Sequence, residues 1–270
     1  MKTENTYNSV LTIAGSDSGG CAGIQADIKS ISACGAYAAS VITATTAQNT
    51  VGVFDINPIP IAHVEKQLDV VLSDIKFKAI KIGMLHSCEI INLVKSKLKS
   101  YDLDNIVIDP VMVATSGDKL IDETAIDCLK NLLPLAKIIT PNIPEAEILL
   151  GNKINVHNLE ESAKKIGETY KTSVLLKGGH IKSQSKEMVD ILYKIETGKL
   201  VTIKNPRIDS NHTHGTGCSL SSSIAAFLAT GKDIEHSSIR ACSFVNRAIA
   251  NGSKITLGKG KGPINHFNLI

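Results

Sequence analysis

The 270-residue sequence contains no tryptophan, and aromatic residues make up only 4% of the chain. No basic cluster is interleaved with these few aromatic residues, and the net charge of +3 is small. A nucleic-acid-binding protein usually carries a basic stripe or patch, so we expect no nucleic-acid partner.

Long apolar runs are missing as well. The N-terminus is polar up to Val10, and the apolar run that begins there ends at Ala14. This run has the length of a β-strand and is too short for a membrane span or for the apolar core of a signal peptide. We therefore expect no association with a membrane.

The chain also lacks paired cysteine motifs. Its six cysteines are scattered, which favours reduced thiols in a cytoplasmic enzyme over a disulfide framework. His212, His214 and Cys218 lie close enough in sequence to be metal ligands. Because no Cys-x-x-Cys or His-Glu-x-x-His motif is present, zinc is not expected.

What is present is a regular alternation of strand-length apolar runs with segments of helical periodicity. The expected strands are 10–14, 40–45, 51–56, 79–82, 106–108, 137–140 and 173–176, with an antiparallel hairpin at 189–203. The expected helices begin near residues 22, 64, 90, 121, 159, 217 and 233. In the first of them, Ile24, Ile28 and Ile31 should face the core. This alternation predicts an α/β fold with a mostly parallel sheet covered by helices on both faces. Without repeats or linkers, residues 1–270 should form one domain.

Polar residues directly follow several expected strands, where ligands bind in such sheets. They are the loop at 15–20, Gly83-Met84, Asp109, Asn142 with Glu145, and Lys177. Asp109 and Glu145 suit Mg²⁺, directly or through water, and Lys177 can neutralise a phosphate. The alternative for Asn142 and Glu145 is a helix-capping role. Three lysines among glycines, Lys254, Lys259 and Lys261, resemble a solvated loop.

The segment Gly215-Thr216-Gly217-Cys218 is expected to turn tightly into a helix. Glycine lets a ligand approach the backbone, and the unpaired N–H groups of a first helical turn favour phosphate. The same helix end should lower the pKa of the Cys218 thiol from about 8.5 toward neutrality, which would make it a base. Alternatively, Cys218 is a small buried apolar residue.

Seven motifs together carry a resemblance to a known family. They are Gly-Ser-Asp-Ser-Gly-Gly at 15–20, Thr-Ala-Gln-Asn at 46–49, Lys-Ile-Gly-Met at 81–84, Asp-Pro-Val-Met at 109–112, Thr-Pro-Asn-Ile-Pro-Glu at 140–145, Lys-Gly-Gly-His at 177–180 and His-Gly-Thr-Gly-Cys at 214–218. In this order, across nearly the whole chain, they resemble the hydroxymethylpyrimidine/phosphomethylpyrimidine kinases of thiamine biosynthesis. These enzymes have a ribokinase-like fold.

The resemblance implies phosphorylation of 4-amino-5-hydroxymethyl-2-methylpyrimidine, and then of its monophosphate, with ATP and Mg²⁺. It also implies a homodimer. Cys218 would be the base in place of the aspartate usual in the superfamily. The N–H groups of Gly215, Thr216, Gly217 and Cys218 would stabilise the transferring phosphoryl group.

The resemblance also implies the binding residues. Gln48 would read the pyrimidine, because its amide can accept from the exocyclic amine and donate to the ring nitrogen. The rest of the pyrimidine pocket would be formed by Gly15, Asp27, Met84 and Val111. The nucleotide and Mg²⁺ side would be formed by Asp109, Asn142, Glu145 and Lys177, with adenine near the hairpin and the last two helices. Thr115 stands where many relatives have lysine, so we give it no charge-neutralising role. His180 and His214 are expected only to order loops.

Three alternatives remain at this stage. Pyridoxal kinases belong to the same superfamily, although Gln48 and its loop favour an aminopyrimidine. The glycine-rich segment 15–23 is compatible with an NAD(P)-dependent oxidoreductase, but the fingerprint spacing and an acid after the second strand are missing. A non-catalytic binding protein that keeps the pocket is the third alternative.

Overall fold

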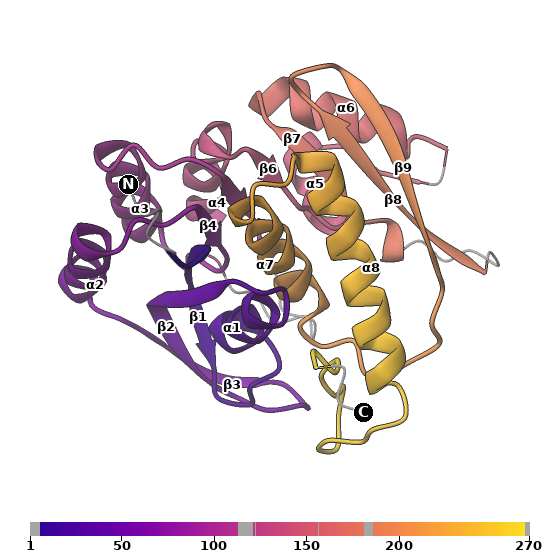
Figure 1. The fold of residues 1–270 in the computed structure, drawn as a ribbon, viewed down its shortest axis with the longest axis horizontal. Helices are drawn as coiled ribbons and strands as arrows, with labels where there is room; N and C mark the ends of the chain where they lie inside the picture. The colour runs from indigo at the N-terminus through magenta and orange to yellow at the C-terminus, as the bar shows by residue number, and fades with distance from the viewer. Residues whose placement is uncertain (1–5, 113–120, 122, 156, 181–185, 268–270) are drawn as a thin grey trace.

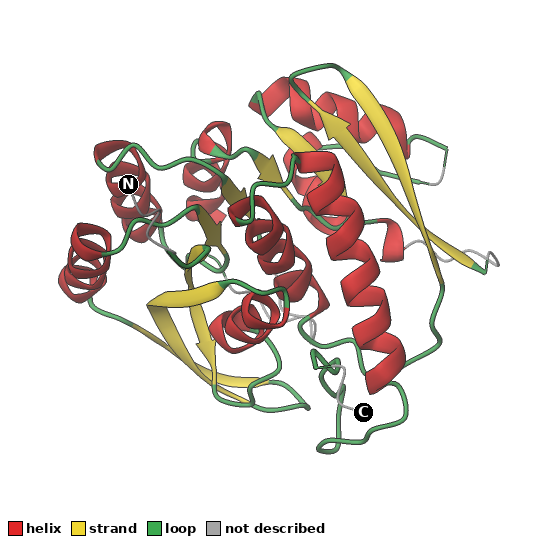
Figure 2. Ribbon diagram, viewed as in Figure 1, coloured by secondary structure: helices red, strands yellow, loops and turns green. Residues whose placement is uncertain are grey.

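The structure is a computed structural model that describes residues 6–112, 121, 123–155, 157–180 and 186–267. All strands in these ranges belong to one nine-stranded sheet with the order β3-β2-β1-β4-β5-β6-β7-β8-β9 (Figures 1 and 2). The strands are β1 (Ser9–Asp17), β2 (Tyr37–Gln48), β3 (Val53–Pro58), β4 (Ala79–Ile82), β5 (Ile106–Ile108), β6 (Ile138–Ile139), β7 (Ser173–Leu176), β8 (Glu187–Lys194) and β9 (Lys199–Pro206).

The middle of the sheet is parallel, and its edges are antiparallel. Strands β2, β1, β4, β5, β6 and β7 pair in parallel, whereas β3, β8 and β9 pair antiparallel. Every residue of β4, β5 and β7 is buried, as expected for parallel strands covered on both faces. The predicted α/β class and the predicted hairpin are confirmed.

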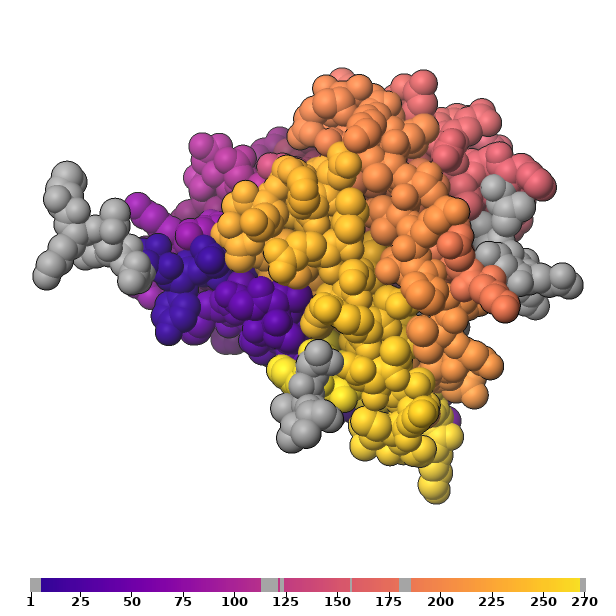
Figure 3. Space-filling model, turned by 45° about the vertical axis from the view of Figure 1, so that its right-hand side comes forward, coloured from indigo at the N-terminus to yellow at the C-terminus, as the bar shows by residue number. Residues whose placement is uncertain are grey.

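Helices cover both faces of the sheet and create two apolar cores. The helices are α1 (Gly23–Ala33), α2 (Ile61–Asp74), α3 (Cys88–Ser100), α4 (Glu123–Lys130), α5 (Ile143–Leu150), α6 (Leu159–Tyr170), α7 (Thr216–Ala229) and α8 (Ile234–Gly252). Residues from α2 to α6 share one core, and residues from α1, α7 and α8 share the other (Figure 1). Figure 3 shows α8 and the C-terminal segment between the N-terminal half and the β8–β9 hairpin. None of the helices described is long and apolar enough to cross a membrane.

Two details of the first elements differ from the prediction. β1 continues through Asp17 where a loop was expected, because a register shift lets Ser16 and Asp17 pair with Thr45 and Thr46 of β2. Ile28 is exposed, so the prediction that it faces the core is wrong. The buried face of α1 instead includes Asp27 and Ser30, and the side chain of Asp27 is directed at α7.

A disulfide joins Cys88 at the start of α3 to Cys128 in α4. The prediction that all cysteines are reduced is therefore wrong for this pair. The two residues are 40 positions apart in sequence, so their proximity arises only from the packing of α3 against α4 and leaves no sequence signal. The cytoplasmic location rested on reduced thiols, and it remains a prediction.

Candidate active site

A cavity of about 1320 Å³ opens at the carboxyl ends of the parallel strands. It is lined by residues at or just after the carboxyl ends of the six parallel strands, by the start of α7, and by residues of the β8–β9 hairpin and α8. Of the predicted site residues, the structure brings together Gly15, Gln48, Met84, Asp109, Val111, Asn142, Glu145, Lys177, Gly215, Thr216, Gly217 and Cys218. The sheet topology thus gathers residues that are far apart in sequence into one space.

The start of α7 has the predicted tight turn into a helix. Gly215 is the N-cap, with φ of +82°, and a β-carbon there would collide with the carbonyl oxygen of Cys21. Glycine is therefore needed on both conformational and steric grounds. A β-carbon on Gly217 would lie 3.3 Å from Lys177 Nζ and 3.5 Å from Asp109 Oδ2. The first turn of α7 therefore faces a charged cluster.

Cys218 lies in this first turn, half-buried, and lines the cavity. Burial raises the pKa of its thiol to about 11, although Lys81 and a hydrogen bond to the backbone of Gly23 act in the opposite direction. The predicted fall of this pKa toward neutrality is not found in the ligand-free protein, because desolvation outweighs the effects of Lys81 and the Gly23 backbone. The thiol is protonated at neutral pH.

Lys177, Asp109 and Glu145 form the charged cluster opposite α7. Asp109 Oδ1 accepts hydrogen bonds from Lys177 Nζ at 3.0 Å and from Thr140 Oγ1 at 3.0 Å. Glu145 Oε2 lies 4.0 Å from Lys177 Nζ. Burial raises the pKa of Glu145 to about 7, against the effect of Lys177 and with that of Asp109. A ligand that changes the local charge can therefore change the protonation of Glu145.

Asn142 and Glu145 also cap α5. Asn142 Oδ1 accepts from the Glu145 N–H at 2.9 Å, and Glu145 Oε2 accepts from the Asn142 N–H at 2.8 Å. The structural alternative for these residues is thus confirmed. It does not conflict with a ligand role, because both side chains line the cavity and the cap holds them at its wall.

The donor set in this cluster fits Mg²⁺. No group of three or more histidine, cysteine, aspartate and glutamate residues is clustered for a metal anywhere in the described ranges. Mg²⁺ does not need such a cage, because it keeps several waters and takes one or two carboxylates together with substrate phosphates. Asp109 and Glu145 supply that number.

Gln48 lines the cavity and contacts His214, which directly precedes the N-cap of α7. Their Nε2 atoms are 3.1 Å apart, and Gln48 Oε1 lies 3.2 Å from Thr46 Oγ1. Burial lowers the pKa of His214, so the ring is neutral at pH 7. His214 was expected only to order a loop, but it lines the cavity and contacts Gln48 directly.

Gly15 and Met84 lie next to each other in the wall of the cavity. A β-carbon on Gly15 would lie 2.6 Å from Met84 Cε, so the glycine leaves room for the methionine side chain. Val111 lines the same cavity. Thr115 and the side chain of His180 lie outside the described part of the structure.

Asp27 does not line the cavity, so the prediction that it contacts substrate does not fit its placement. It is fully buried and lies 2.8 Å from Lys81 Nζ. Its partner Lys81 lines the cavity instead, although no role was predicted for Lys81 from the sequence. The available signal was a lysine inside the short apolar strand Ala-Ile-Lys-Ile, where only a paired cation is tolerated.

Lys261 was also missed. It is exposed, as expected for a solvated loop, and it also lines the cavity. Its neighbours fix the segment: the Gly260 N–H donates to Thr50 Oγ1 at 3.1 Å, and the Gly262 carbonyl accepts from the His214 N–H at 3.2 Å.

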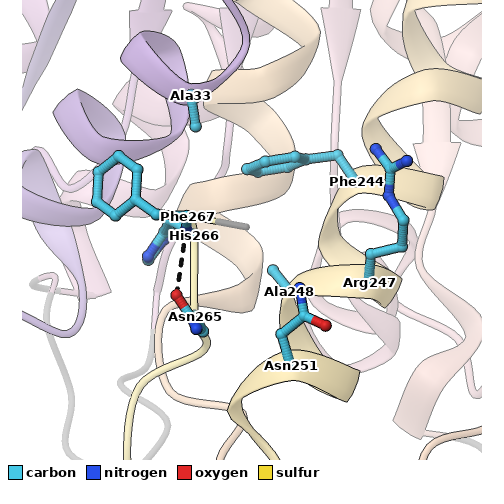
Figure 4. A pocket seen from close by; sticks show the side chains of 8 residues that line it. All are labelled: Ala33, Phe244, Arg247, Ala248, Asn251, Asn265, His266 and Phe267. Atoms are coloured by element: carbon cyan, nitrogen blue, oxygen red, sulfur yellow. Dashed lines mark hydrogen bonds between the residues drawn. The ribbon is translucent and has the colours of Figure 1, made fainter. Parts of the chain in front are cut away.

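A second cavity of about 350 Å³ lies between the end of α1, α8 and the C-terminal segment (Figure 4). It is lined by Ala33, Phe244, Arg247, Ala248, Asn251, Asn265, His266 and Phe267. None of the predicted site residues is among them.

The fold and the larger cavity define a class, the small-molecule kinases with a ribokinase-like fold. The solved pyridoxal kinase of Bacillus subtilis, an ADP complex, has a TM-score of 0.87 and 33% identity, over 97% of this chain and 98% of its own. The solved phosphomethylpyrimidine kinase of Clostridium difficile has a TM-score of 0.78 and 42% identity, over 89% of this chain and 99% of its own.

Sequence comparison identifies the family within this class of kinases. The phosphomethylpyrimidine kinase model matches residues 17–265, and the chain belongs to this family. The hydroxymethylpyrimidine/phosphomethylpyrimidine kinase of Haemophilus influenzae is 43% identical over 260 residues, covering 96% of each chain. The thiamine biosynthesis bifunctional protein ThiED of Geobacter sulfurreducens is 46% identical over 261 residues, which are 96% of this chain but 52% of that protein. This chain thus spans about half of the bifunctional relative.

Proposed function

We propose that this protein phosphorylates 4-amino-5-hydroxymethyl-2-methylpyrimidine, and then its monophosphate, with ATP as the phosphoryl donor. The observation that carries the proposal is a single cavity lined both by Gln48 and by the first turn of α7, which faces Lys177 and Asp109. Support comes from the Haemophilus relative, which is named a hydroxymethylpyrimidine/phosphomethylpyrimidine kinase, and from the ADP complex of the Bacillus neighbour.

Different groups of this protein have separate roles in the proposed phosphoryl transfer. The N–H groups of Gly215, Thr216, Gly217 and Cys218 would hold the charge that develops on the transferred phosphoryl group. Lys177 would neutralise phosphate oxygens as a point charge. Mg²⁺, when bound with ATP, would neutralise further phosphate charge, and Asp109 and Glu145 are the side chains that would hold it.

The two phosphorylations differ in their need for a base. The hydroxymethyl group is an alcohol, so its proton must be removed as the oxygen attacks, and Cys218 is the proposed base. The acceptor in the second reaction is a phosphate oxygen that is already ionised near neutral pH. The second reaction therefore needs positioning and charge neutralisation but no thiolate.

An assay of ADP release with purified protein, ATP and Mg²⁺ tests the proposed function. We expect ADP release on addition of the aminopyrimidine, and mass spectrometry should show the monophosphate followed by the diphosphate. Failure to release ADP with either the pyrimidine or pyridoxal would reject a kinase in favour of a binding protein. An absorbance change with NAD(P)H would instead indicate an oxidoreductase.

Pyridoxal is the second candidate substrate, because the fold matches the Bacillus pyridoxal kinase with a TM-score of 0.87. In a competition assay we expect the aminopyrimidine to have the higher kcat/KM. The physical reason is that Gln48 can pair with an adjacent amine and ring nitrogen, which pyridoxal does not present. A higher kcat/KM for pyridoxal would reverse the assignment.

Replacing Gln48 by methionine should raise the KM for the aminopyrimidine about 10- to 100-fold, because two hydrogen bonds are lost in a half-buried site. The KM for ATP should stay unchanged. The matched control is Gln67→Met in α2, which removes two hydrogen bonds to the backbone of Ile42 at a residue that does not line the cavity. An equal KM in the Gln48 variant and wild type would exclude Gln48 as the pyrimidine reader.

A homodimer, a single domain over residues 1–270 and a cytoplasmic location complete the proposal. These three proposals rest on the resemblance and on sequence composition rather than on a contact in the structure. Light scattering on the purified protein would measure its molar mass and so test the homodimer.

A further inference from the structure

A buried ion pair lies next to α7, the helix whose first turn contains Cys218. The side chains of Asp27 in α1 and Lys81 in β4 are both 0% exposed, with Lys81 Nζ 2.8 Å from Asp27 Oδ2. Two hydroxyl groups complete the carboxylate's partners. Thr12 Oγ1 in β1 donates to Oδ2 at 2.6 Å, and Ser222 Oγ in α7 donates to Oδ1 at 2.6 Å.

The two members of the pair are not equivalent. Asp27 accepts from three side chains and is closed off from the cavity. Lys81 has three N–H donors, and in the described part of the chain Asp27 is the one hydrogen-bond partner recorded for them. Lys81 also lines the cavity together with Cys218. A buried pair is costly and is often replaceable by apolar residues without loss of stability, so stability alone does not account for a cation here.

We propose that Lys81 is a positioning residue that stabilises the thiolate form of Cys218, and that Asp27 holds its ammonium in place and moderates its charge. This inference rests on the proposed function, in which Cys218 removes the proton of the hydroxymethyl group. Lys81 itself exchanges no proton. The thiol first releases its proton to solvent. The resulting thiolate then takes the proton of the alcohol as the alcohol oxygen bonds to the γ-phosphorus of ATP and the bond from that phosphorus to ADP breaks.

The charges around Cys218 fit this assignment. Lys81 from β4 and Lys177 after β7 are the cations that interact with it, and Asp27 and Asp109 are the anions. After burial, Lys81 has the largest single effect on the pKa of Cys218 and lowers it, whereas Asp27 raises it by less. The two halves of one ion pair therefore act on the thiol in opposite directions.

This opposition provides a test that does not need turnover. The rate of alkylation by iodoacetamide follows the thiolate fraction, and the tryptic peptide 208–232 contains Cys218 as its single cysteine. Lys81→Met should slow alkylation of this peptide about tenfold at any pH between about 8 and 10, which is one unit of pKa. Asp27→Asn should speed it. In the kinase assay, Lys81→Met should slow the first phosphorylation more than the second.

The controls separate charge from folding. Thr12→Val removes a hydrogen bond to Asp27 without changing a charge, and it should leave the alkylation rate as in wild type. If either single variant fails to fold, the double variant Lys81→Met/Asp27→Asn has no unpaired buried charge, and it should still alkylate more slowly than wild type.

Slower alkylation in both single variants, or an unchanged rate in the double variant, would overturn the proposal and leave the pair a purely structural one. Because alkylation needs no ATP or pyrimidine, these results stand apart from the test of the proposed function. A protein without kinase activity whose Cys218 still responds as predicted would reject that function alone.

Discussion

Replacing Cys218 by alanine should slow phosphorylation of the hydroxymethyl group by about 10²- to 10⁴-fold, the usual contribution of a general base. Phosphorylation of the monophosphate should fall much less, because its attacking oxygen is already ionised. Single-turnover measurements of the two reactions, each started from its own acceptor, give the comparison directly. An equal loss in both reactions would exclude the base role.

The pH dependence of the same two reactions gives an independent check. The thiolate is the active form, and the pKa of Cys218 is raised to about 11 in the free protein. The rate of the first reaction should therefore rise with pH, by up to about tenfold per unit between pH 7 and 9. The second reaction should be nearly flat over this range. A first reaction that does not respond to pH would show that another group accepts the proton.

Replacing Asp109 by asparagine should lower both kinase activity and stability. The change leaves the buried Lys177 ammonium without its closest anion, at 3.0 Å, and it removes one of the two proposed Mg²⁺ ligands. Breaking such a pair costs about 3 to 5 kcal/mol. We expect a value near 3, because Glu145 lies 4.0 Å from Lys177 and can ionise in compensation. Both phosphorylations should slow about 100-fold or more.

Thermal denaturation and steady-state kinetics measure the two effects of Asp109→Asn separately. The matched control is Thr140→Val, which removes the other hydrogen bond to Asp109 Oδ1 but no charge. It should cost about 1 kcal/mol of stability and leave the dependence of the rate on Mg²⁺ as in wild type. If Asp109→Asn keeps wild-type activity at saturating Mg²⁺ and ATP, Asp109 holds neither.

Most of the fold was accessible from the sequence, because the core strands are short apolar runs separated by periodic helices. The bounds of β4, β5 and β7 agree with prediction residue for residue. Asp109 and Lys177 directly follow parallel strands, whose carboxyl ends meet at one edge of the sheet. Their proximity was therefore also predictable from the sequence. Their meeting follows from topology and needs no knowledge of side-chain packing.

What sequence reasoning missed depends on packing between distant segments. The direction of the pKa shift of Cys218 follows from its burial, which depends on the segments that pack around it. The Cys88–Cys128 bond and the burial of Asp27 against Ser222 likewise join residues whose spacing carries no pattern. Lys261 reaches the cavity only because glycines let its segment pack on Thr50.

The size of the main cavity bears on the order of events during catalysis. At about 1320 Å³ it exceeds the space that one small ligand usually fills, and both Gln48 and residues of α8 line it. Donor and acceptor therefore have room to occupy the protein at the same time. The phosphoryl group can then pass straight from one to the other, with no phosphorylated side chain as an intermediate carrier.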